Sequence, residues 1–247
     1  MENFKIALIG YGNMGKELKR LATLRNMNVT QIFDEDSPIF EAKKFDFDVA
    51  LDFSIPSAVL PNAEIVAKAK KNLVVGTTGW YDKSDTMKQI ALDNNIGIVW
   101  GANFSLGMQI FFRLTALAAE LADSVGEYDI FVHEIHHRRK KDSPSGTAHN
   151  LGNIILENFD EKSKILVNTP HAEIHQNQLH VTSTRGGHVP GTHTVYLDSE
   201  VDTLELTHRA RNRSGFAGGA LKAAELIHGK KGYFSFEELL GMFWEKK

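Results

Sequence analysis

The segment Phe4-Lys5-Ile6-Ala7-Leu8-Ile9-Gly10-Tyr11-Gly12-Asn13-Met14-Gly15 begins with an apolar run and continues into a glycine-rich turn. The run predicts a buried strand, and leucines at positions 18, 21 and 24 predict a helix after the turn. In such a strand–turn–helix, the first glycine permits the tight turn, the second admits a pyrophosphate and the third allows close helix–strand packing. The segment therefore predicts dinucleotide binding, with cofactor contacts at Gly10, Gly12, Asn13, Met14 and Gly15.

A second predicted strand, Val29–Phe33, ends at Asp34. A carboxylate at this position usually binds the ribose hydroxyls of NAD, and an ordinary turn aspartate is the alternative. Glu35 and Asp36 follow, and no arginine stands there to receive a 2′-phosphate. The local charge therefore favours NADH over NADPH, although nearby lysines could weaken this preference and leave NADPH possible.

Three more predicted strands, Val49–Phe53, Leu73–Val75 and Ile96–Trp100, alternate with predicted helices, a pattern typical of a doubly wound parallel sheet. Ligands bind such sheets at the carboxyl ends of the strands. The turns that follow two of these strands are therefore further candidate cofactor contacts: Gly76, Thr77 and Thr78, and Gly101, Ala102, Asn103 and Phe104. A plain strand-exit turn is the alternative for the first of them.

After a predicted helix at 105–123 the pattern changes to strands grouped together: Tyr128–His136, His171–Thr184, His193–Ser199 and Thr203–Arg211, with a helix at about 146–159. This grouping predicts an α+β domain with a mixed or antiparallel sheet. An apolar open face on that sheet would invite a partner subunit, so we expect an oligomer. We expect the C-terminal segment to return to the first domain.

The segment from His133 to Ala148 contains six consecutive basic or imidazole side chains, from His136 to Lys141, and then a Pro-Ser-Gly-Thr turn that opens a helix. A helix N-terminus binds anions, and Ser145, Gly146 and Thr147 would form it. With Lys140 and two histidines beside it, the turn suits a small polyanion that also needs a proton. A solvated basic face, a nucleic-acid contact and a zinc site from His133, His136 and His137 are the alternatives. The net charge of −3 and the absence of aromatic residues in the run disfavour nucleic acid.

Composition limits the remaining classes. The 247 residues are enough for a substantial core and for two domains. The absence of cysteine excludes disulfides, thiolate catalysis and cysteine-ligated metals. The N-terminus has no signal-peptide pattern, and the most apolar long segment carries Arg113 and Glu120, so we expect a cytoplasmic protein without membrane contact.

The segment from Glu134 to Ala148 resembles the dihydrodipicolinate reductase family, as do Asp52-Phe53-Ser54, Gly76-Thr77-Thr78-Gly79, Ala102-Asn103-Phe104-Ser105 and Leu206-Thr207-His208. The resemblance covers essentially the whole chain. It implies a Rossmann-type dinucleotide-binding domain at 1–103 and 213–247, and a substrate-binding domain at 104–212 whose sheet builds a homotetramer. It also implies reduction of 4-hydroxy-tetrahydrodipicolinate to tetrahydrodipicolinate, with loss of water, in lysine and diaminopimelate biosynthesis.

The resemblance further implies residue roles. His136 resembles the general acid, Lys140 the cationic donor near the reacting ring nitrogen, and His137 a substrate contact, while Gly146 and Thr147 resemble the backbone cradle for a substrate carboxylate. No metal is implied. The first loop departs from the family pattern because Asn13 stands where relatives carry an arginine that helps hold a 2′-phosphate. Another imine- or aldehyde-reducing dehydrogenase and a non-catalytic NAD-binding sensor remain as alternative functions.

Overall fold

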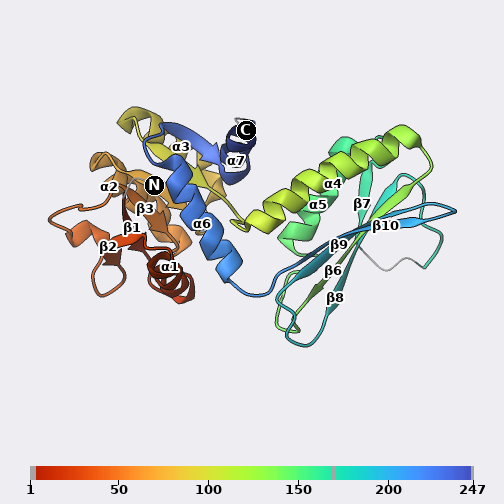
Figure 1. Ribbon diagram of the computed structural model, residues 1–247, viewed down its shortest axis with the longest axis horizontal. Helices are drawn as coiled ribbons and strands as arrows, with labels where there is room; N and C mark the ends of the chain where they lie inside the picture. Colours follow the sequence, from red (N-terminus) through yellow and green to blue (C-terminus); the bar gives the residue numbers. More distant parts are fainter. Residues whose placement is uncertain (1–3, 168–170, 246–247) are drawn as a thin grey trace. The chain divides into compact units, whose positions relative to one another are not determined.

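The computed structural model describes residues 4–167 and 171–245, which form two compact units. Unit 1 combines the chain up to Leu106 with the chain from Arg213 onward, and unit 2 is Gly107–Asn212. The colouring of Figure 1 shows this directly, because both the red and the blue ends of the chain contribute to the same unit. None of the helices in the described part of the chain is long and apolar enough to cross a membrane.

Unit 1 is built on a six-stranded sheet in which every strand pair is parallel. The strand order is β11-β5-β4-β3-β1-β2, formed by β1 (Lys5–Ile9), β2 (Asn28–Phe33), β3 (Val49–Asp52), β4 (Asn72–Val75), β5 (Gly97–Trp100) and β11 (Gly232–Ser235). Short apolar runs such as Lys5–Ile9 can serve as strands here because both faces of the sheet are covered.

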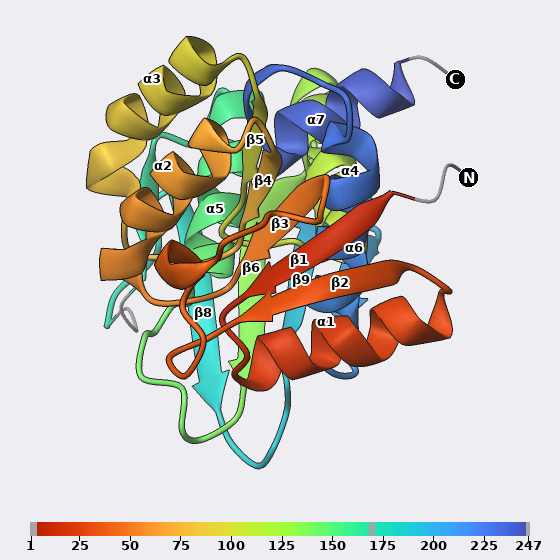
Figure 2. The same ribbon diagram turned by 90° about the vertical axis from the view of Figure 1, so that its left-hand side faces the viewer.

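Helices cover both faces of this sheet, as Figure 2 shows. One face packs against α1 (Asn13–Leu24), α6 (Ser214–Ile227) and α7 (Phe236–Trp244), in a core that includes Leu8, Leu51 and Leu221. The other face packs against α2 (Val59–Lys68) and α3 (Ser84–Asn94), around Ile9, Val75 and Trp80. Three short 3-10 segments, Ile39–Glu41, Pro56–Ala58 and Tyr81–Lys83, lie in the connections.

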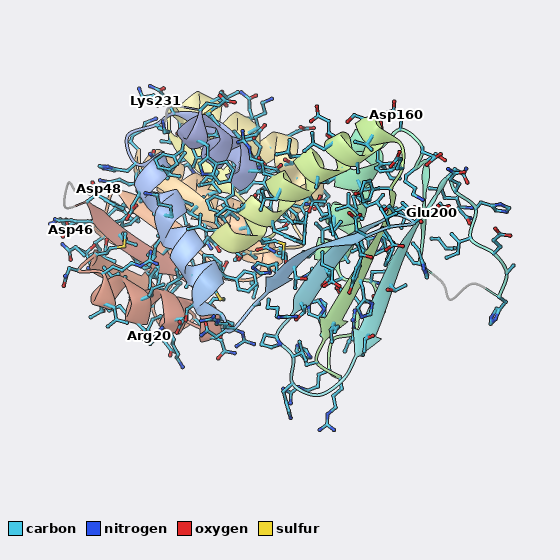
Figure 3. The ribbon with its side chains drawn as sticks, turned by 45° about the vertical axis from the view of Figure 1, so that its right-hand side comes forward. Arg20, Asp46, Asp48, Asp160, Glu200 and Lys231 are labelled. Atoms are coloured by element: carbon cyan, nitrogen blue, oxygen red, sulfur yellow. The ribbon has the colours of Figure 1, made fainter. Side chains whose placement is uncertain are left out.

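Unit 2 contains a five-stranded mixed sheet in the order β10-β9-β6-β8-β7. Its elements are α4 (Leu106–Val125, which begins at the unit boundary), β6 (Asp129–His136), α5 (Gly146–Asn158), β7 (Lys164–Leu166), β8 (Gln178–Arg185), β9 (Thr192–Asp198) and β10 (Thr203–Arg209). Residues of α4 and α5 pack on one sheet face with Val132, Val181 and Val195. Glu200, labelled in Figure 3, lies in the turn between β9 and β10.

The predicted fold class, a doubly wound parallel sheet plus an α+β domain with a mixed sheet, is confirmed. Two short strands, β7 and β11, were not predicted from sequence. The strand predicted at His171–Thr184 is too long, because residues 171–177 form a loop and β8 begins at Gln178.

Candidate functional site

The glycine-rich turn lies at the carboxyl end of β1. The structure explains the presence of glycine at its three positions in different ways. Gly10 has a φ of +89°, and a Cβ there would lie 2.5 Å from the carbonyl oxygen of Phe53. A Cβ at Gly15 would collide with the carbonyl oxygen of Gly10. A Cβ at Gly12 would meet no protein atom within 4 Å. Packing explains the first and third glycines, whereas the second leaves open space of the kind that a pyrophosphate needs.

The start of α1 adds an electrostatic reason for an anion to bind here. Gly12 is the N-cap residue and supplies no side-chain hydrogen bond, and the first turn of the helix, with Asn13 and Met14, contains no acidic residue. The partial positive charge of the helix N-terminus is therefore not offset by the helix itself. The residues present fit the diphosphate of a dinucleotide.

Asp34 follows β2, and its carboxylate shapes the turn. Oδ1 accepts hydrogen bonds from the backbone N–H groups of Asp36 at 3.1 Å and Ser37 at 3.0 Å. This is the arrangement expected of a turn aspartate. A ribose hydroxyl would have to bind the other oxygen, Oδ2.

A buried carboxylate, Asp52, ties together the turns that follow β3 and β4. It accepts hydrogen bonds from the backbone and hydroxyl of Ser54 at 2.9 and 2.6 Å, from Asn62 at 2.9 Å and from the Thr77 hydroxyl at 2.9 Å. Burial raises the pKa of Asp52, and these hydrogen bonds act in the opposite direction. The Thr77 hydroxyl is thus used inside the protein, while its neighbour Thr78 is exposed.

The turn after β5 is supported by aromatic packing. Phe104 is buried and its ring lies 4.7 Å from Phe236 and 6.2 Å from Phe53, measured between centroids. Its side chain therefore belongs to the core, and its carbonyl oxygen packs against Gly219 of α6. The Asn103 side chain accepts a hydrogen bond from Ser105 N at 2.9 Å, and Ala102 is exposed. All the predicted cofactor residues thus lie at the carboxyl edge of one sheet, with Gly76 and Gly101 directly after β4 and β5.

In unit 2, the predicted catalytic and substrate residues follow β6 along one loop into α5. His136 is the last residue of β6, and Ser145 is the N-cap of α5, where its hydroxyl accepts a hydrogen bond from Ala148 N. Gly146 and Thr147 form the first turn, and a Cβ at Gly146 would meet nothing within 4 Å. Lys140 Nζ donates to Asp142 at 2.9 Å.

Glu134 lies at the centre of this region, and no role was predicted for it from the sequence. Its carboxylate is fully buried and accepts hydrogen bonds from the backbone N–H of Ser145 at 2.8 Å, from the Ser183 hydroxyl at 2.8 Å and from Arg185 Nη2 at 2.6 Å. It also accepts a short hydrogen bond from the Ser145 hydroxyl. The Ser145 side chain is therefore held by the protein itself.

Two histidines flank the same carboxylate. His136 Nδ1 lies 3.2 Å and His193 Nε2 lies 3.4 Å from Oε2 of Glu134. Burial of the Glu134 carboxyl raises its pKa, but the interactions with His136, His193, Ser145 and Arg185 outweigh this and hold the pKa far below its usual range. Burial lowers the pKa of His193. These effects favour the ionised form of the Glu134 carboxylate and the neutral form of His193.

The histidine grouping differs from the one considered from sequence. His133 points to the opposite sheet face, where its Nδ1 lies 2.7 Å from the Thr182 hydroxyl, whereas His136 groups with His193 and Glu134. Strand alternation is the signal that could have linked Glu134 to His136, since residues two apart share a face. His193 could not be found that way, because only the β6–β9 register pairs it with Glu134.

Comparison with known proteins identifies the family to which the chain belongs. A family model described as dihydrodipicolinate reductase, N-terminus, matches residues 4–104, and one described as dihydrodipicolinate reductase, C-terminus, matches residues 107–240. The chain is 37% identical to the 4-hydroxy-tetrahydrodipicolinate reductase of Christiangramia forsetii over 95% of this chain and 97% of that one. It is 36% identical to the enzyme of the same name from Methanococcus aeolicus, over 91% and 77% of the two chains.

Among solved structures, the fold is similar to that of a dipicolinate-bound dihydrodipicolinate reductase from a Paenisporosarcina species. The TM-score is 0.76 at 21% identity, with 95% of this chain and 98% of that chain covered. The two matched family models together span nearly the whole sequence, and the curated relatives exceed 30% identity over most of their own length. The chain therefore belongs to the dihydrodipicolinate reductase family.

Proposed function

We propose that this chain, an oxidoreductase of lysine and diaminopimelate biosynthesis, reduces 4-hydroxy-tetrahydrodipicolinate with His136 as general acid and Lys140 as the cationic donor. The observation that carries the proposal is that one buried carboxylate, Glu134, joins His136 to the start of α5. A proton donor and an anion-binding helix start therefore lie in the same part of unit 2. Reduction of a dicarboxylate that must also take up a proton needs these two features.

The proposed substrate contacts are groups of this loop. Lys140 and the backbone of Gly146 and Thr147 would bind a substrate carboxylate, and the missing Cβ of Gly146 would let it approach. Ser145 would act mainly by capping α5. His137 would contact the substrate, because its buried Nδ1 has no hydrogen-bond partner among the described residues. A buried nitrogen of this kind is normally satisfied, and a ligand would supply the partner.

The proposed cofactor groups lie at the sheet edge of unit 1. Gly10, Gly12 and Gly15 with the start of α1 would hold the diphosphate, Asp34 the adenosine ribose, and the turns after β4 and β5 the nicotinamide side. A bound nicotinamide supplies the hydride, and His136 then delivers the proton from its ring. The family uses NAD(P)H. We infer a preference for NADH, because Asp34, Glu35 and Asp36 put negative charge where a 2′-phosphate would lie.

We also propose a homotetramer. The sheet face of unit 2 opposite to α4 and α5 carries Phe131 and Tyr196, which are partly exposed and stacked at 4.9 Å. Ile135, four residues after Phe131 on β6, lies on the same face and is also partly exposed. An apolar sheet face of this kind is a typical subunit interface. Sedimentation velocity tests the assembly, and a monomer at micromolar concentration would contradict it.

Calorimetric titration tests the substrate site without turnover. The dicarboxylate 2,6-pyridinedicarboxylate would be titrated into wild-type protein, Lys140→Ala and the matched control Lys141→Ala, each with NADH present. We expect Lys140→Ala to weaken binding by about 10-fold or more, a loss of about 1.4 kcal/mol, whereas the exposed Lys141 contributes little. Equal affinities for the three proteins would contradict the role of Lys140.

A further inference from the structure

We infer that Glu134 is a positioning residue for His136: its carboxylate fixes the proton on Nδ1, so that Nε2 is the nitrogen that exchanges a proton with the substrate. The inference rests on the proposed role of His136 as general acid. It is carried by the distribution of hydrogen-bond donors around the two carboxylate oxygens.

The first oxygen, Oε1, accepts hydrogen bonds from three donors. Two of them, a backbone N–H and a guanidinium, can only donate, and the third is a hydroxyl. These are the Ser145 backbone N–H at 2.8 Å, Arg185 Nη2 at 2.6 Å and the Ser183 hydroxyl at 2.8 Å. Arg185 also donates a hydrogen bond to the backbone oxygen of Asp142 at 2.6 Å. This second hydrogen bond links the guanidinium to the loop before α5 and restricts its movement. The orientation of the carboxylate is thus fixed from the side of Oε1.

The second oxygen, Oε2, accepts the hydrogen bond of the Ser145 hydroxyl and faces the two imidazoles. His136 Nδ1 lies 3.2 Å away, in contact but outside ideal hydrogen-bond geometry, and the described residues offer this buried nitrogen no better-aligned partner. A carboxylate only accepts hydrogen bonds when ionised, so the nitrogen that faces it carries hydrogen. The His193 ring packs against His136 at 5.1 Å between centroids, with the ring planes at 76°, and so restrains its rotation.

The other ring nitrogen is kept uncovered by a glycine. A Cβ at Gly191 would lie 2.9 Å from His136 Nε2. The glycine-rich loop at 186–191 therefore lies next to the proposed acid. His137 N donates to Val189 O at 2.8 Å and so fastens this loop to the end of β6.

This arrangement has a chemical consequence for proton transfer. The doubly protonated ring gives the Nε2 proton to the substrate, and the neutral ring that remains keeps hydrogen on Nδ1, toward Glu134. Glu134 remains ionised throughout and accepts no proton. The carboxylate therefore stabilises the charged acid before transfer and selects a single neutral tautomer afterwards.

Other charged and titratable groups lie on the elements around Glu134 and His136. Arg185 lies on β8, His193 on β9, and Lys140 with Asp142 in the loop before α5. One nitrogen or oxygen each of Glu134, His136 and His193 lie within 4.8 Å of one another, a spacing that a metal ion could also use. The guanidinium of Arg185 on the same carboxylate opposes a divalent cation, so we favour the positioning role.

The variant Glu134→Gln gives a sharp test because its amide has one preferred orientation. The carbonyl oxygen is expected to replace Oε1, where the Ser145 N–H and Arg185 can only donate. The NH₂ group then replaces Oε2, where the Ser145 hydroxyl can rotate to accept from it, and presents hydrogen to His136 Nδ1. We expect the neutral ring to move its proton to Nε2, which ¹⁵N NMR of histidine-labelled protein detects. We expect kcat to fall by about 10²–10⁴-fold, and the limb of the pH–rate profile that descends at high pH to move to lower pH.

Asp129→Asn is the matched control, an acid-to-amide change on the same strand. Asp129 pairs with Lys162 at 2.5 Å at the other end of β6. The tautomer of His136 and the pH–rate profile should therefore remain unchanged in Asp129→Asn. If Glu134→Gln does not fold, the ¹⁵N NMR spectrum of the wild-type protein still tests the inference. The signals of His136 are assigned in that spectrum by their absence from the spectrum of His136→Gln. A neutral wild-type His136 with its proton on Nε2 overturns the inference, as does stoichiometric zinc retained by wild type and lost from Glu134→Gln. Full turnover by His136→Gln would instead overturn the proposed function and leave the tautomer result standing.

Discussion

Lys140 Nζ lies 2.9 Å from the carboxylate of Asp142, two residues further along the same loop. The hydrogen bond from Lys140 holds the pKa of Asp142 below its usual range, and the backbone of Gly146 acts in the same direction. A carboxylate of the protein thus interacts with two of the groups proposed to bind a substrate carboxylate. Substrate would have to compete with Asp142 for them.

Asp142→Asn should therefore strengthen dicarboxylate binding. The Asp142 side chain is 56% exposed and that of Lys140 is 23% exposed, so solvent weakens the pair and the gain should be at most about fivefold. Titration with 2,6-pyridinedicarboxylate measures it, with Asp160→Asn as the surface control. Weaker binding in Asp142→Asn would show that Asp142 orients Lys140 instead of competing for its charge.

Gly12→Ala should separate cofactor binding from stability. The added Cβ meets no protein atom within 4 Å, so the melting temperature should change little. The same Cβ would occupy space proposed for the diphosphate, so NADH should bind at least about 10-fold more weakly. Fluorescence titration with NADH and a thermal melt measure both properties. Unchanged NADH affinity would contradict the assignment of this turn.

Glu134 should make the stability of unit 2 depend on pH in the acidic range. Its folded pKa is depressed, so its ionised form contributes stability above the unfolded pKa of about 4.3. This contribution is lost as the pH falls below that value toward the folded pKa. The difference in unfolding free energy between wild type and Glu134→Gln should be largest near neutral pH and shrink in acid, as denaturant titrations at several pH values would measure. A difference that grows on acidification would contradict an ionised Glu134.

Gly219 in α6 should be intolerant of a side chain. A Cβ there would collide with the carbonyl oxygen of Phe104, and backbone cannot move aside cheaply. Gly219→Ala should cost at least about 1–3 kcal/mol of unfolding free energy. Gly241→Ala is the matched control in α7, where a Cβ meets nothing, and should stabilise by about 0.5–1 kcal/mol. Similar unfolding midpoints for the two variants would contradict the described packing of α6.

The parallel sheet was predictable because its signals are local. The apolar run before Gly10, the glycine spacing and the turns after Phe53, Val75 and Trp100 all read directly from neighbouring residues. The strands β7 and β11 have three and four residues and carry no alternation long enough to stand out. They form because β8 and β5 offer unpaired edges, which is information about tertiary structure.

The candidate site divides in the same way. His136, Lys140 and the start of α5 lie within one loop, so a contiguous motif contained them. The residues that surround His136 come from distant parts of the sequence. Arg185 is 51 residues from Glu134, and His193 lies beside Glu134 only because β6 and β9 pair in this register. Their roles depend on pairing between strands, which single-sequence patterns do not specify.

Steady-state turnover tests the central claim most directly. The substrate would be formed in situ from pyruvate and aspartate semialdehyde by its synthase, and oxidation of NADH and NADPH would be followed in separate assays. We expect rapid oxidation with NADH preferred, inhibition by 2,6-pyridinedicarboxylate, and a loss of about 10²–10⁴-fold in kcat for His136→Gln with the fold intact. Tight NADH binding without turnover, or a His136→Gln variant as fast as wild type, would contradict the account.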